Sequence, residues 1–454
     1  MVNRIKSFCG DYSMLLVLVG LCIFFAVATL DTQMPTGAAA ATQLIPHVKP
    51  YLAEENTALV ITGNAPDDRS FVSALKEAFA GQEKSLQFLA GVSPRRVRQE
   101  LEKIVATENV PSVIVGTRSV SHWSLLQQLG EKFEGLRNVP FLLPQKTTSS
   151  NFLKPANLKN VAGQSAVFAI IAIGMTLVII TGGIDLSVGS LVALSAVTAA
   201  MVIRDLFGGI DAGFGGMMTG MVVAIVISAL IGFLSGIMIT VFGMPPFIVT
   251  LATMSIARGL AQILADGQSV YQVPDAFSYL AVGKPFGIPN EVIVMLLLYV
   301  FAHIMMTHTT LGRWFYAVGS NREAARLSGV PVGFVLMVAY IASGGLAGVG
   351  GVLEASRLQS GSPLYGVMYE LYVITAVVVG GTSLAGGEGK MFGTLFGALA
   401  IAVIRNGMNL MNIESYTQGV VMGLLILLAV FIDSLKRGHV IAWLKRLGVK
   451  SSTL

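Results

Sequence analysis

Long apolar stretches, almost free of charge, dominate the sequence and restrict what this chain can fold into. A hydrocarbon core about 30 Å thick is crossed by a helix of roughly 17–25 mostly apolar residues. Backbone polar groups find no water in lipid, so each spanning segment is predicted to be helical. Ten such stretches lie at about 14–30, 164–181, 184–203, 217–240, 246–265, 292–308, 332–352, 370–381, 392–411 and 417–433. The stretch at 370–381 is too short to cross alone, so it either extends back through 365–369 or enters the membrane and returns.

Charged residues make up 12% of the chain, about half the share of an ordinary soluble protein. Between Ile45 and Ser150, 23 of 106 residues are charged, whereas the other 348 residues hold only 32. This contrast predicts an all-α polytopic membrane protein with about ten transmembrane helices and one small α/β insert. The expected divisions are an N-terminal tail with the first helix (1–44), the insert (45–150), the transmembrane domain (151–435) and a basic tail (436–454).

The remaining composition excludes several classes of function. The net charge of +5 is small for this length and indicates membrane orientation rather than nucleic-acid binding. The two cysteines, Cys9 and Cys22, offer no disulfide framework, zinc site or redox pair. Gly389-Lys390 does not complete a phosphate-binding loop, because Leu384 stands where its first glycine belongs. We therefore expect no metal, no cofactor and no ATP hydrolysis on this chain.

The distribution of Lys and Arg in short loops predicts the orientation of the spans. With the N-terminus inside, eleven basic residues fall in inner loops and five in outer ones. This places both termini in the cytoplasm and the insert outside it. The inner set is Arg4, Lys6, Arg313, Arg322, Arg326, Lys390, Lys436, Arg437, Lys445, Arg446 and Lys450, and the outer set is Lys154, Lys159, Arg204, Lys284 and Arg357.

The first span has two readings. Arg4 and Lys6 precede an apolar core, and Gly37-Ala38-Ala39-Ala40 resembles the cleavage site of a signal peptide. The apolar core at 14–30 is longer than the usual core of a signal peptide, which favours a retained membrane anchor. Cleavage would leave the orientation of everything downstream unchanged.

The insert alternates short apolar runs with helical patterns, which predicts a small parallel sheet covered by helices. Ser93 and Pro94 suit the start of its middle helix. Ile61–Asn64, followed by Asp67 and Asp68, is similar to the opening of a lobe in sugar-binding periplasmic proteins. Those proteins close two lobes around a sugar, so the sequence assigns this single lobe a docking or spacer role rather than ligand binding. The expected strands are 58–62, 86–90, 112–116 and 140–143, and the expected helices are 68–80, 94–107 and 120–134.

Three polar or glycine-rich breaks interrupt the apolar helices, and such breaks are tolerated at depth only against protein or a water-filled cavity. In the first, Asp185 or Ser187 either caps the next helix or faces the translocation path. In the second, Asn321 caps a short amphipathic helix that ends at Gly329 and suits a groove on a partner. In the third, at 380–389, glycines allow a tight turn whose role is packing or ligand contact.

Lone polar side chains inside the spans are candidates for the translocation path, although bonds to neighbouring carbonyls are the simpler explanation for each. Arg258 lies in the fifth span, and Arg405, Asn406 and Asn409 lie in the ninth. Arg405 and Asn409 are one turn apart on one helical face.

Taken together, these stretches strongly resemble the permease subunits of ABC importers for ribose, xylose, galactose and related sugars. The resemblance covers 152–435, and Gly182–Ser190 is its signature. Pro245–Met254, which contains Thr250, and the turn Gly380–Gly389 add support. Within the signature we single out Gly182, Gly183, Asp185, Ser187 and Gly189, and Thr250 joins Arg405, Asn406 and Asn409 as a candidate for the sugar path.

The resemblance implies a bacterial-type inner-membrane permease that works as a dimer with two cytoplasmic ATPase domains and a periplasmic sugar receptor. It implies that one loop is the coupling helix that docks on the ATPase, with Asn321, Glu323, Ala324, Ala325 and Gly329 as its residues. Two features depart from the family pattern: Ser235 stands where an Asn is usual, and the insert is not part of the usual permease.

Two other classes of function remain as alternatives. An ion-coupled secondary transporter is motivated by Asp185 and Arg405 as ionisable groups within the membrane. A membrane sensor would use the insert as a ligand-binding domain. Paired, symmetrically broken helices would favour the first alternative, and a cytoplasmic output domain would favour the second.

Overall fold

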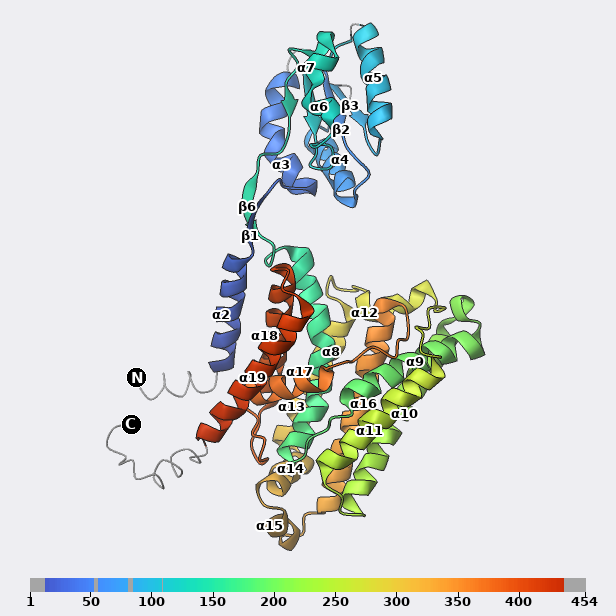
Figure 1. Cartoon of the computed structure of the whole chain (residues 1–454), viewed down its shortest axis with the longest axis vertical. Helices are drawn as coiled ribbons and strands as arrows, with labels where there is room; N and C mark the ends of the chain where they lie inside the picture. Colours follow the sequence, from blue (N-terminus) through green and yellow to red (C-terminus); the bar gives the residue numbers. More distant parts are fainter. Residues whose placement is uncertain (1–12, 53–55, 81–84, 108, 437–454) are drawn as a thin grey trace, which may run out of the picture. The chain divides into compact units, whose positions relative to one another are not determined.

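The computed structural model describes residues 13–52, 56–80, 85–107 and 109–436, and Figure 1 shows their helices and strands. The chain divides into two compact units. One combines Met1–Thr29 with Asn151–Leu454, and the other is Leu30–Ser150. The predicted basic residues Arg4 and Lys6, together with Cys9 and positions 437–454, lie outside the described residues.

The first unit is helical, and each predicted apolar stretch falls largely on one of its helices, which confirms an all-α polytopic membrane protein. Eight of its described helices are long and apolar enough to cross a membrane, and two shorter apolar helices, Met14–Ala28 and Tyr369–Val379, accompany them. The elements are α2 (Ser13–Ala28), α8 (Pro155–Ile180), α9 (Val188–Phe207), α10 (Phe214–Thr240), α11 (Pro246–Leu264), α12 (Tyr279–Val282), α13 (Asn290–His308), α14 (Thr310–Ser320), α15 (Arg322–Leu327), α16 (Val332–Leu358), α17 (Tyr369–Val379), α18 (Met391–Leu410) and α19 (Ser415–Lys436).

The helix α8 forms the centre of this unit, since nearly all of its most apolar window is buried. A helix that is apolar on every side belongs either in lipid or in a protein core. Around it, glycines bring helix backbones close together, as small residues do in membrane proteins. A Cβ at Gly174 would lie 2.6 Å from the Cα of Ser343 on α16, and a Cβ at Gly344 would collide with the carbonyl of Ser228 on α10.

The short apolar stretch near 370–381 resolves into a half-length helix preceded by irregular chain. The helix α17 begins at Tyr369, directly after Met368 at φ +68°. The preceding segment is not a continuation of this helix, and Arg258 on α11 stabilises it by donating to the carbonyls of Pro363 and Tyr365 at 2.6 and 2.7 Å. Arg258 is thus satisfied by neighbouring carbonyls, one of the two roles that the sequence left open.

The second unit begins earlier than the predicted boundary at Ile45. A two-stranded antiparallel ribbon, β1 (Leu30–Gln33) with β6 (Thr147–Ser150), holds its two ends together. Ala40, within the stretch that resembles a cleavage site, and Ala41, directly after it, are buried in α3 (Gly37–Val48) and pack in the core shared with α4. In the first unit, Phe25 of α2 packs against Phe152 and Val403.

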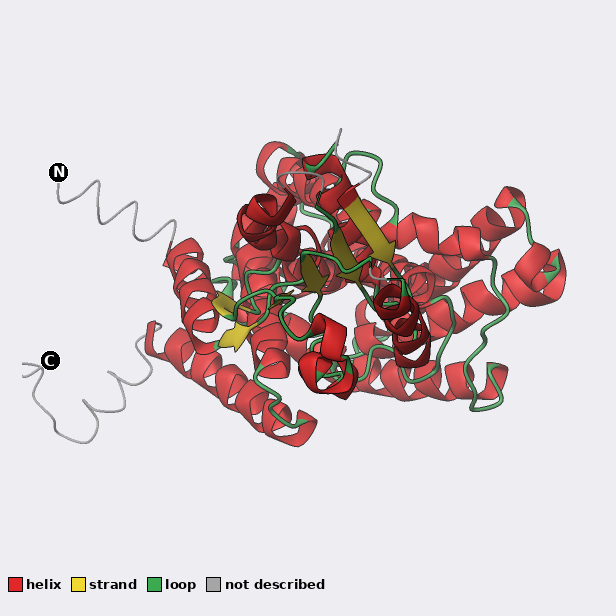
Figure 2. Ribbon diagram, turned by 90° about the horizontal axis from the view of Figure 1, so that it is seen from above, coloured by secondary structure: helices red, strands yellow, loops and turns green. Residues whose placement is uncertain are grey.

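A four-stranded parallel sheet forms the core of the second unit, and Figure 2 shows its strands in yellow. The strand order is β3-β2-β4-β5, and each strand falls within one of the predicted apolar runs. Ser93 occupies the N-cap position of α5 with Pro94 at the first helical position, but its side chain makes no capping bond. The elements are β2 (Ala58–Ile61), α4 (Pro66–Ala78), β3 (Leu86–Leu89), α5 (Pro94–Ala106), β4 (Val113–Gly116), α6 (Ser124–Gln127), α7 (Leu129–Lys132) and β5 (Phe141–Leu142).

The close crossing of α10 and α16 yields a stability prediction. We expect Gly344→Ala to lower the thermal unfolding midpoint in detergent, because the new Cβ collides with backbone and overpacking costs about 1–3 kcal/mol. Gly333→Ala on the same helix is the control, since a Cβ there meets no atom within 4 Å. Equal midpoints for the two variants would contradict this account of the crossing.

Candidate functional site

The three breaks singled out in the sequence meet at one place in the first unit. The N–H of Gly387 in the third break donates to the carbonyl of Ile180 at the end of α8, at 2.8 Å. The Tyr316 hydroxyl on α14 donates to the carbonyl of Gly389, also at 2.8 Å. Arg322, the first residue of α15, donates to the carbonyl of Thr181 at 3.1 Å. We call this meeting of 180–187, 316–330 and 380–389 the glycine junction.

Glycine is required where these backbones come together. A Cβ at Gly319 would collide with the Ile180 carbonyl and would lie 2.5 Å from the Gly387 nitrogen. Gly387 itself has φ +78°, a conformation that side-chain-bearing residues rarely adopt. The close contact therefore places the backbone of α14 directly against the end of α8.

The carboxylate of Asp185 stabilises the turn between α8 and α9 through hydrogen bonds. It is 2% exposed and accepts from the Ser187 N–H at 2.9 Å, from the Ser187 hydroxyl at 2.6 Å and from the Ser343 hydroxyl on α16 at 2.7 Å. On the other side of the turn, the Thr250 hydroxyl on α11 donates to the carbonyl of Ile184 at 3.1 Å. Ser187 is the N-cap residue of α9, and its hydroxyl goes to Asp185 rather than to the helix end. These bonds tie the first break to two other helices.

The other signature glycines also lie against neighbouring segments. A Cβ at Gly183 would approach the Tyr340 hydroxyl of α16, and a Cβ at Gly189 would collide with Glu370 and with the carbonyl of Gly366. Gly182 has φ +77° and lies near the carbonyl of Ala385. The signature stretch is thus packed against α16, α17 and the third break.

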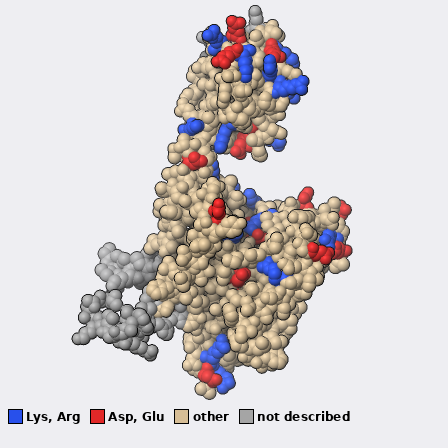
Figure 3. Space-filling view, viewed as in Figure 1, with Lys and Arg blue, Asp and Glu red and all other residues tan. Residues whose placement is uncertain are grey.

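The helix α15 is formed as the sequence predicts. Asn321 caps it by accepting from the Ala324 N–H at 3.0 Å, and Gly329 follows its end at φ +83°. Ala325 is buried, whereas Glu323 and Arg326 are each 70% exposed and pair at 3.1 Å. Leu327, beside them, is 85% exposed. Figure 3 shows the charges of this segment at one end of a largely uncharged helical unit.

The polar residues of the ninth span do not form one cluster. Arg405 lies over the rings of Phe168 and Tyr372, with its guanidinium carbon 5.4 and 5.1 Å from the ring centres. Asn409 accepts from Gln418 on α19 at 2.8 Å.

Asn406 pairs with a different helix. It exchanges two amide hydrogen bonds with Asn157 of α8, at 2.9 and 3.0 Å. Arg405, Asn406 and Asn409 therefore each bind a separate neighbour, and Thr250 lies apart from them at the glycine junction.

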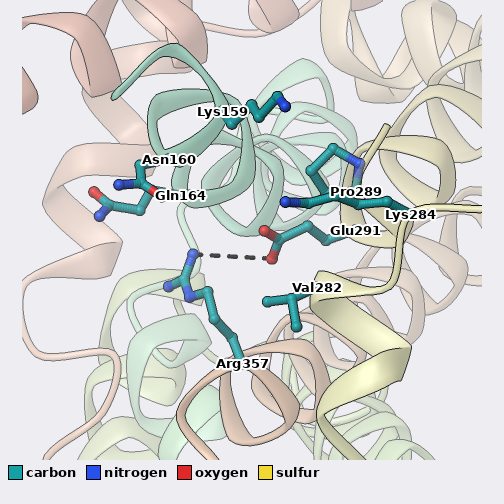
Figure 4. A pocket seen from close by; sticks show the side chains of 8 residues that line it. All are labelled: Lys159, Asn160, Gln164, Val282, Lys284, Pro289, Glu291 and Arg357. Carbon is teal, nitrogen blue, oxygen red and sulfur yellow. Dashed lines mark ion pairs between the residues drawn. The ribbon is translucent and has the colours of Figure 1, made fainter. Parts of the chain in front are cut away.

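A cluster that sequence reasoning missed lies where α8 and α13 begin and α16 ends, as Figure 4 shows. Arg357 pairs with Glu354 at 2.7 Å, and its second pairing, with Glu291, is 3.9 Å long. The side chains of all three are at most 18% exposed. Gly163 on α8 leaves room for Glu291, because a Cβ there would collide with its carboxylate.

A cavity of about 160 Å³ lies beside the ion pair and is rimmed by Lys159 and Lys284. The sequence signal was weak: Glu291 and Glu354 stand near helix ends, where charges are ordinary, and only the fold brings them to Arg357. This cavity and the glycine junction lie at opposite ends of α8, with Lys159 near the start of that helix and Ile180 as its last residue.

Comparison with known proteins identifies the helical unit. Residues 157–430 match the family model described as a permease component of branched-chain amino acid transport systems. The chain belongs to this family of transport permeases. It is 41% identical to the ribose import permease protein of Escherichia coli K12 over 295 residues, which are 64% of this chain and 89% of that one. No solved structure matches it.

Other curated relatives carry related names. The ribose import permease protein of Bacillus subtilis is 41% identical over 63% of this chain and 87% of its own length. The D-allose transport system permease protein of E. coli is 36% identical over 63% of this chain and 85% of its own length. The family match begins after the second unit, so the insert of this permease lies outside the matched region.

The backbone contacts of the glycine junction should be lost when Gly319 gains a side chain. We expect Gly319→Ala to speed amide hydrogen exchange in peptides covering 180–187 and 383–390 by roughly tenfold, because the Gly387–Ile180 bond cannot form against a Cβ. Gly333→Ala, in open space on α16, serves as the control. Unchanged exchange in both segments would show that the junction does not depend on Gly319.

Removing the cation from the buried cluster should cost more than breaking an exposed pair. Arg357→Gln leaves Glu291 and Glu354 without their cation, and breaking a buried pair in this way costs about 3–5 kcal/mol. Arg204→Gln breaks the partly exposed pair with Asp205 and is expected to cost about 0–1 kcal/mol. Thermal unfolding of the purified permease compares the two, and similar losses would contradict the assignment.

Proposed function

We propose that this permease is the transmembrane subunit of an ATP-driven importer that moves a monosaccharide, a ribose-like pentose or a hexose, across a bacterial inner membrane. The proposal is supported by three relatives whose printed names specify ribose, D-allose and L-arabinose. The observation that carries the mechanism is the contact of α15 with the end of α8 through Arg322 and Thr181.

In this proposal α15 is the docking element for a separate cytoplasmic ATPase. Its exposed side carries one pair of opposite charges and one large apolar side chain, Leu327, and such a surface suits an amphipathic groove. Its buried side, at Ala325, faces its own chain. ATP binding to the ATPase would displace α15. The backbone contacts of the glycine junction would transmit this displacement to α8, the most buried of the candidate spans.

ATP then selects between inward-open and outward-open states by binding one of them better, which is the only way a ligand can shift such an equilibrium. The sugar undergoes no covalent change. Its path needs neutral donors and acceptors that bind weakly enough to release the cargo. In this proposal the residues of the ninth span are helix-to-helix ties rather than the path itself, since each binds a separate neighbour.

The partners proposed are the ATPase, a periplasmic sugar receptor and a second copy of the permease. The receptor would dock on the outer side, near the mouth lined by Lys159 and Lys284. The insert is proposed to lie on the same outer side, because long domains are translocated largely regardless of their own charge. Both termini are proposed to be cytoplasmic.

The alternative of an ion-coupled transporter loses its motivation in this geometry. Asp185 already accepts three hydrogen bonds and Arg405 is covered by two aromatic rings, so both are accounted for as structural groups. Uptake driven by an ion gradient in liposomes without ATPase would restore that alternative.

Charge reversal on α15 tests the coupling. We expect Glu323→Arg to reduce sugar-stimulated ATPase activity of the assembled importer by roughly tenfold, a change within the usual range of coupling energies. Folding should be unaffected, because the Glu323 side chain is 70% exposed.

The matched control is Asp211→Arg, an exposed acid beyond the opposite end of α9 from the junction. Stimulation and sugar uptake in reconstituted vesicles are measured for both variants. Equal activity for Glu323→Arg and the unmodified protein would remove α15 from the coupling mechanism.

A further inference from the structure

The insert contains a cavity at the carboxyl ends of its parallel strands. Thr62 and Asn64 follow β2, Gly91 follows β3, and Asp68 and Arg69 lie on the first turns of α4. The cavity measures about 320 Å³, near the lower end of the roughly 300–1,000 Å³ that small-molecule sites occupy. In open α/β sheets, ligands bind in crevices just outside the carboxyl ends of the strands. The position and size of this cavity are those of a site for a small ligand.

One buried carboxylate is bonded on one side only. Asp68 is 5% exposed, and its Oδ2 accepts from the Ser119 hydroxyl at 2.7 Å and from the Ala65 N–H at 3.2 Å. Within the part of the insert that the structure describes, these two are the hydrogen bonds of this carboxylate, so Oδ1 takes none. Asp68 lines the cavity, and its Oδ1 is not one of the enclosed atoms that lack a partner, so it is open to the solvent in the cavity. A ligand hydroxyl in the cavity would donate to Oδ1 in place of water.

The surroundings hold this carboxylate in place. Thr117 and Ser119, which follow β4, share a hydrogen bond at 2.7 Å, and Ser119 also accepts from the Gly63 N–H at 3.3 Å. A Cβ at Gly63 would lie 2.9 Å from the Ser119 oxygen and 3.2 Å from Asp68 Oδ2. Glycine at this position therefore allows the network to close behind the carboxylate, which fixes its orientation before any ligand arrives.

The chemistry of the lining selects a neutral, hydroxyl-rich ligand. Asp67 and Asp68 both stand in the first turn of α4, so the positive end of that helix already faces two carboxylates and an anion would be repelled. Asn64, Arg69 and Ser73 are exposed side chains on the wall. Together with Asp68 they offer mixed donors and acceptors, which suit hydroxyl groups that both donate and accept. Described residues form no group of three His, Cys, Asp or Glu that would hold a metal ion.

We propose that the insert is a binding site for a monosaccharide, held by Asp68, Arg69 and Asn64 at the carboxyl edge of its sheet. The site is distinct from the proposed transport function, because it lies wholly within Leu30–Ser150, outside the region that matches the permease family. Its wall offers Val72 and Ala90 but no aromatic ring for stacking, so binding is expected to be weak and fast. The occupancy of such a site would follow the free concentration of the sugar.

The test uses the full-length permease in lipid nanodiscs, without ATPase or receptor, and D-ribose, D-allose and L-arabinose as probes. Hydrogen exchange locates binding, and calorimetry measures it. We expect sugar to slow exchange in peptides covering 62–73 and 90–91. Asp68→Asn should weaken binding by about tenfold, because it replaces a charge-assisted hydrogen bond by a neutral one.

Asp67→Asn is the matched control, since it removes the same charge in the same turn from an exposed residue that does not line the cavity. Arg69→Gln provides a second variant at an exposed position, in case Asp68→Asn unfolds the insert. Protection that is lost in Asp68→Asn or Arg69→Gln and kept in Asp67→Asn supports the proposal.

Three results would overturn it: no protection of 62–73 by any of the sugars at millimolar concentration, protection that survives both cavity variants, or protection by L-leucine in place of sugar. None of these results bears on import. Uptake by the assembled transporter is measured separately, so the site and the proposed transport function can fail independently.

Discussion

Backbone hydrogen bonding in the absence of water is the constraint on which the rest of this structure depends. Where a membrane helix stops within the protein, its last carbonyls need partners from the same chain. The end of α8 meets this need with the Gly387 N–H at Ile180 and with Arg322 at Thr181. In the chain before α17, the carbonyls of Pro363 and Tyr365 accept hydrogen bonds from Arg258. In each case the partner comes from a segment distant in the sequence, so each of these bonds also ties separate parts of the bundle together.

This constraint places the proposed coupling element where it can act. The helix α15 is only six residues long and could not be stable alone. It is held by its Asn321 cap, by the burial of Ala325 and by the bond from Arg322 to α8. Because residues 319 and 387 are glycines, no side chain separates the backbones at this contact. A short helix with an exposed charged face and close backbone contacts to the core is suited to transmit the displacement of a docked partner to the core helices.

The Arg357 cluster and the insert hold buried charge in two different ways. Arg357 lies between Glu291 and Glu354, where α8 and α13 begin and α16 ends, and removing it would leave two acids buried together. In the insert, Asp68 is fixed by Ser119 and keeps one oxygen toward a cavity. The first arrangement closes on itself and supports the fold, whereas the second leaves bonding capacity for a ligand. Both depend on glycine neighbours, Gly163 and Gly63, that make room for a carboxylate.

Much of the architecture could be predicted from the sequence, because the signals are local. The length of an apolar stretch predicts a membrane helix, alternating short runs predict the strands β2 to β5, and Asn321 with Gly329 predicts the bounds of α15. The boundary of the insert was harder to place. Pairing of β1 with β6 joins Leu30 to Ser150, and a short polar strand has no signal until its distant partner is known.

The sequence by itself determined the class of protein, the approximate places of the apolar helices and the capped helix α15, since each follows from neighbouring residues. Only the tertiary structure decided which polar groups act together. It brought three separate breaks into the glycine junction, and it gave Arg405, Asn406 and Asn409 three different partners. It also placed Glu291 beside Arg357 and opened a cavity at Asp68. The physical reason is that burial and hydrogen bonding across a fold depend on residues far apart in the chain.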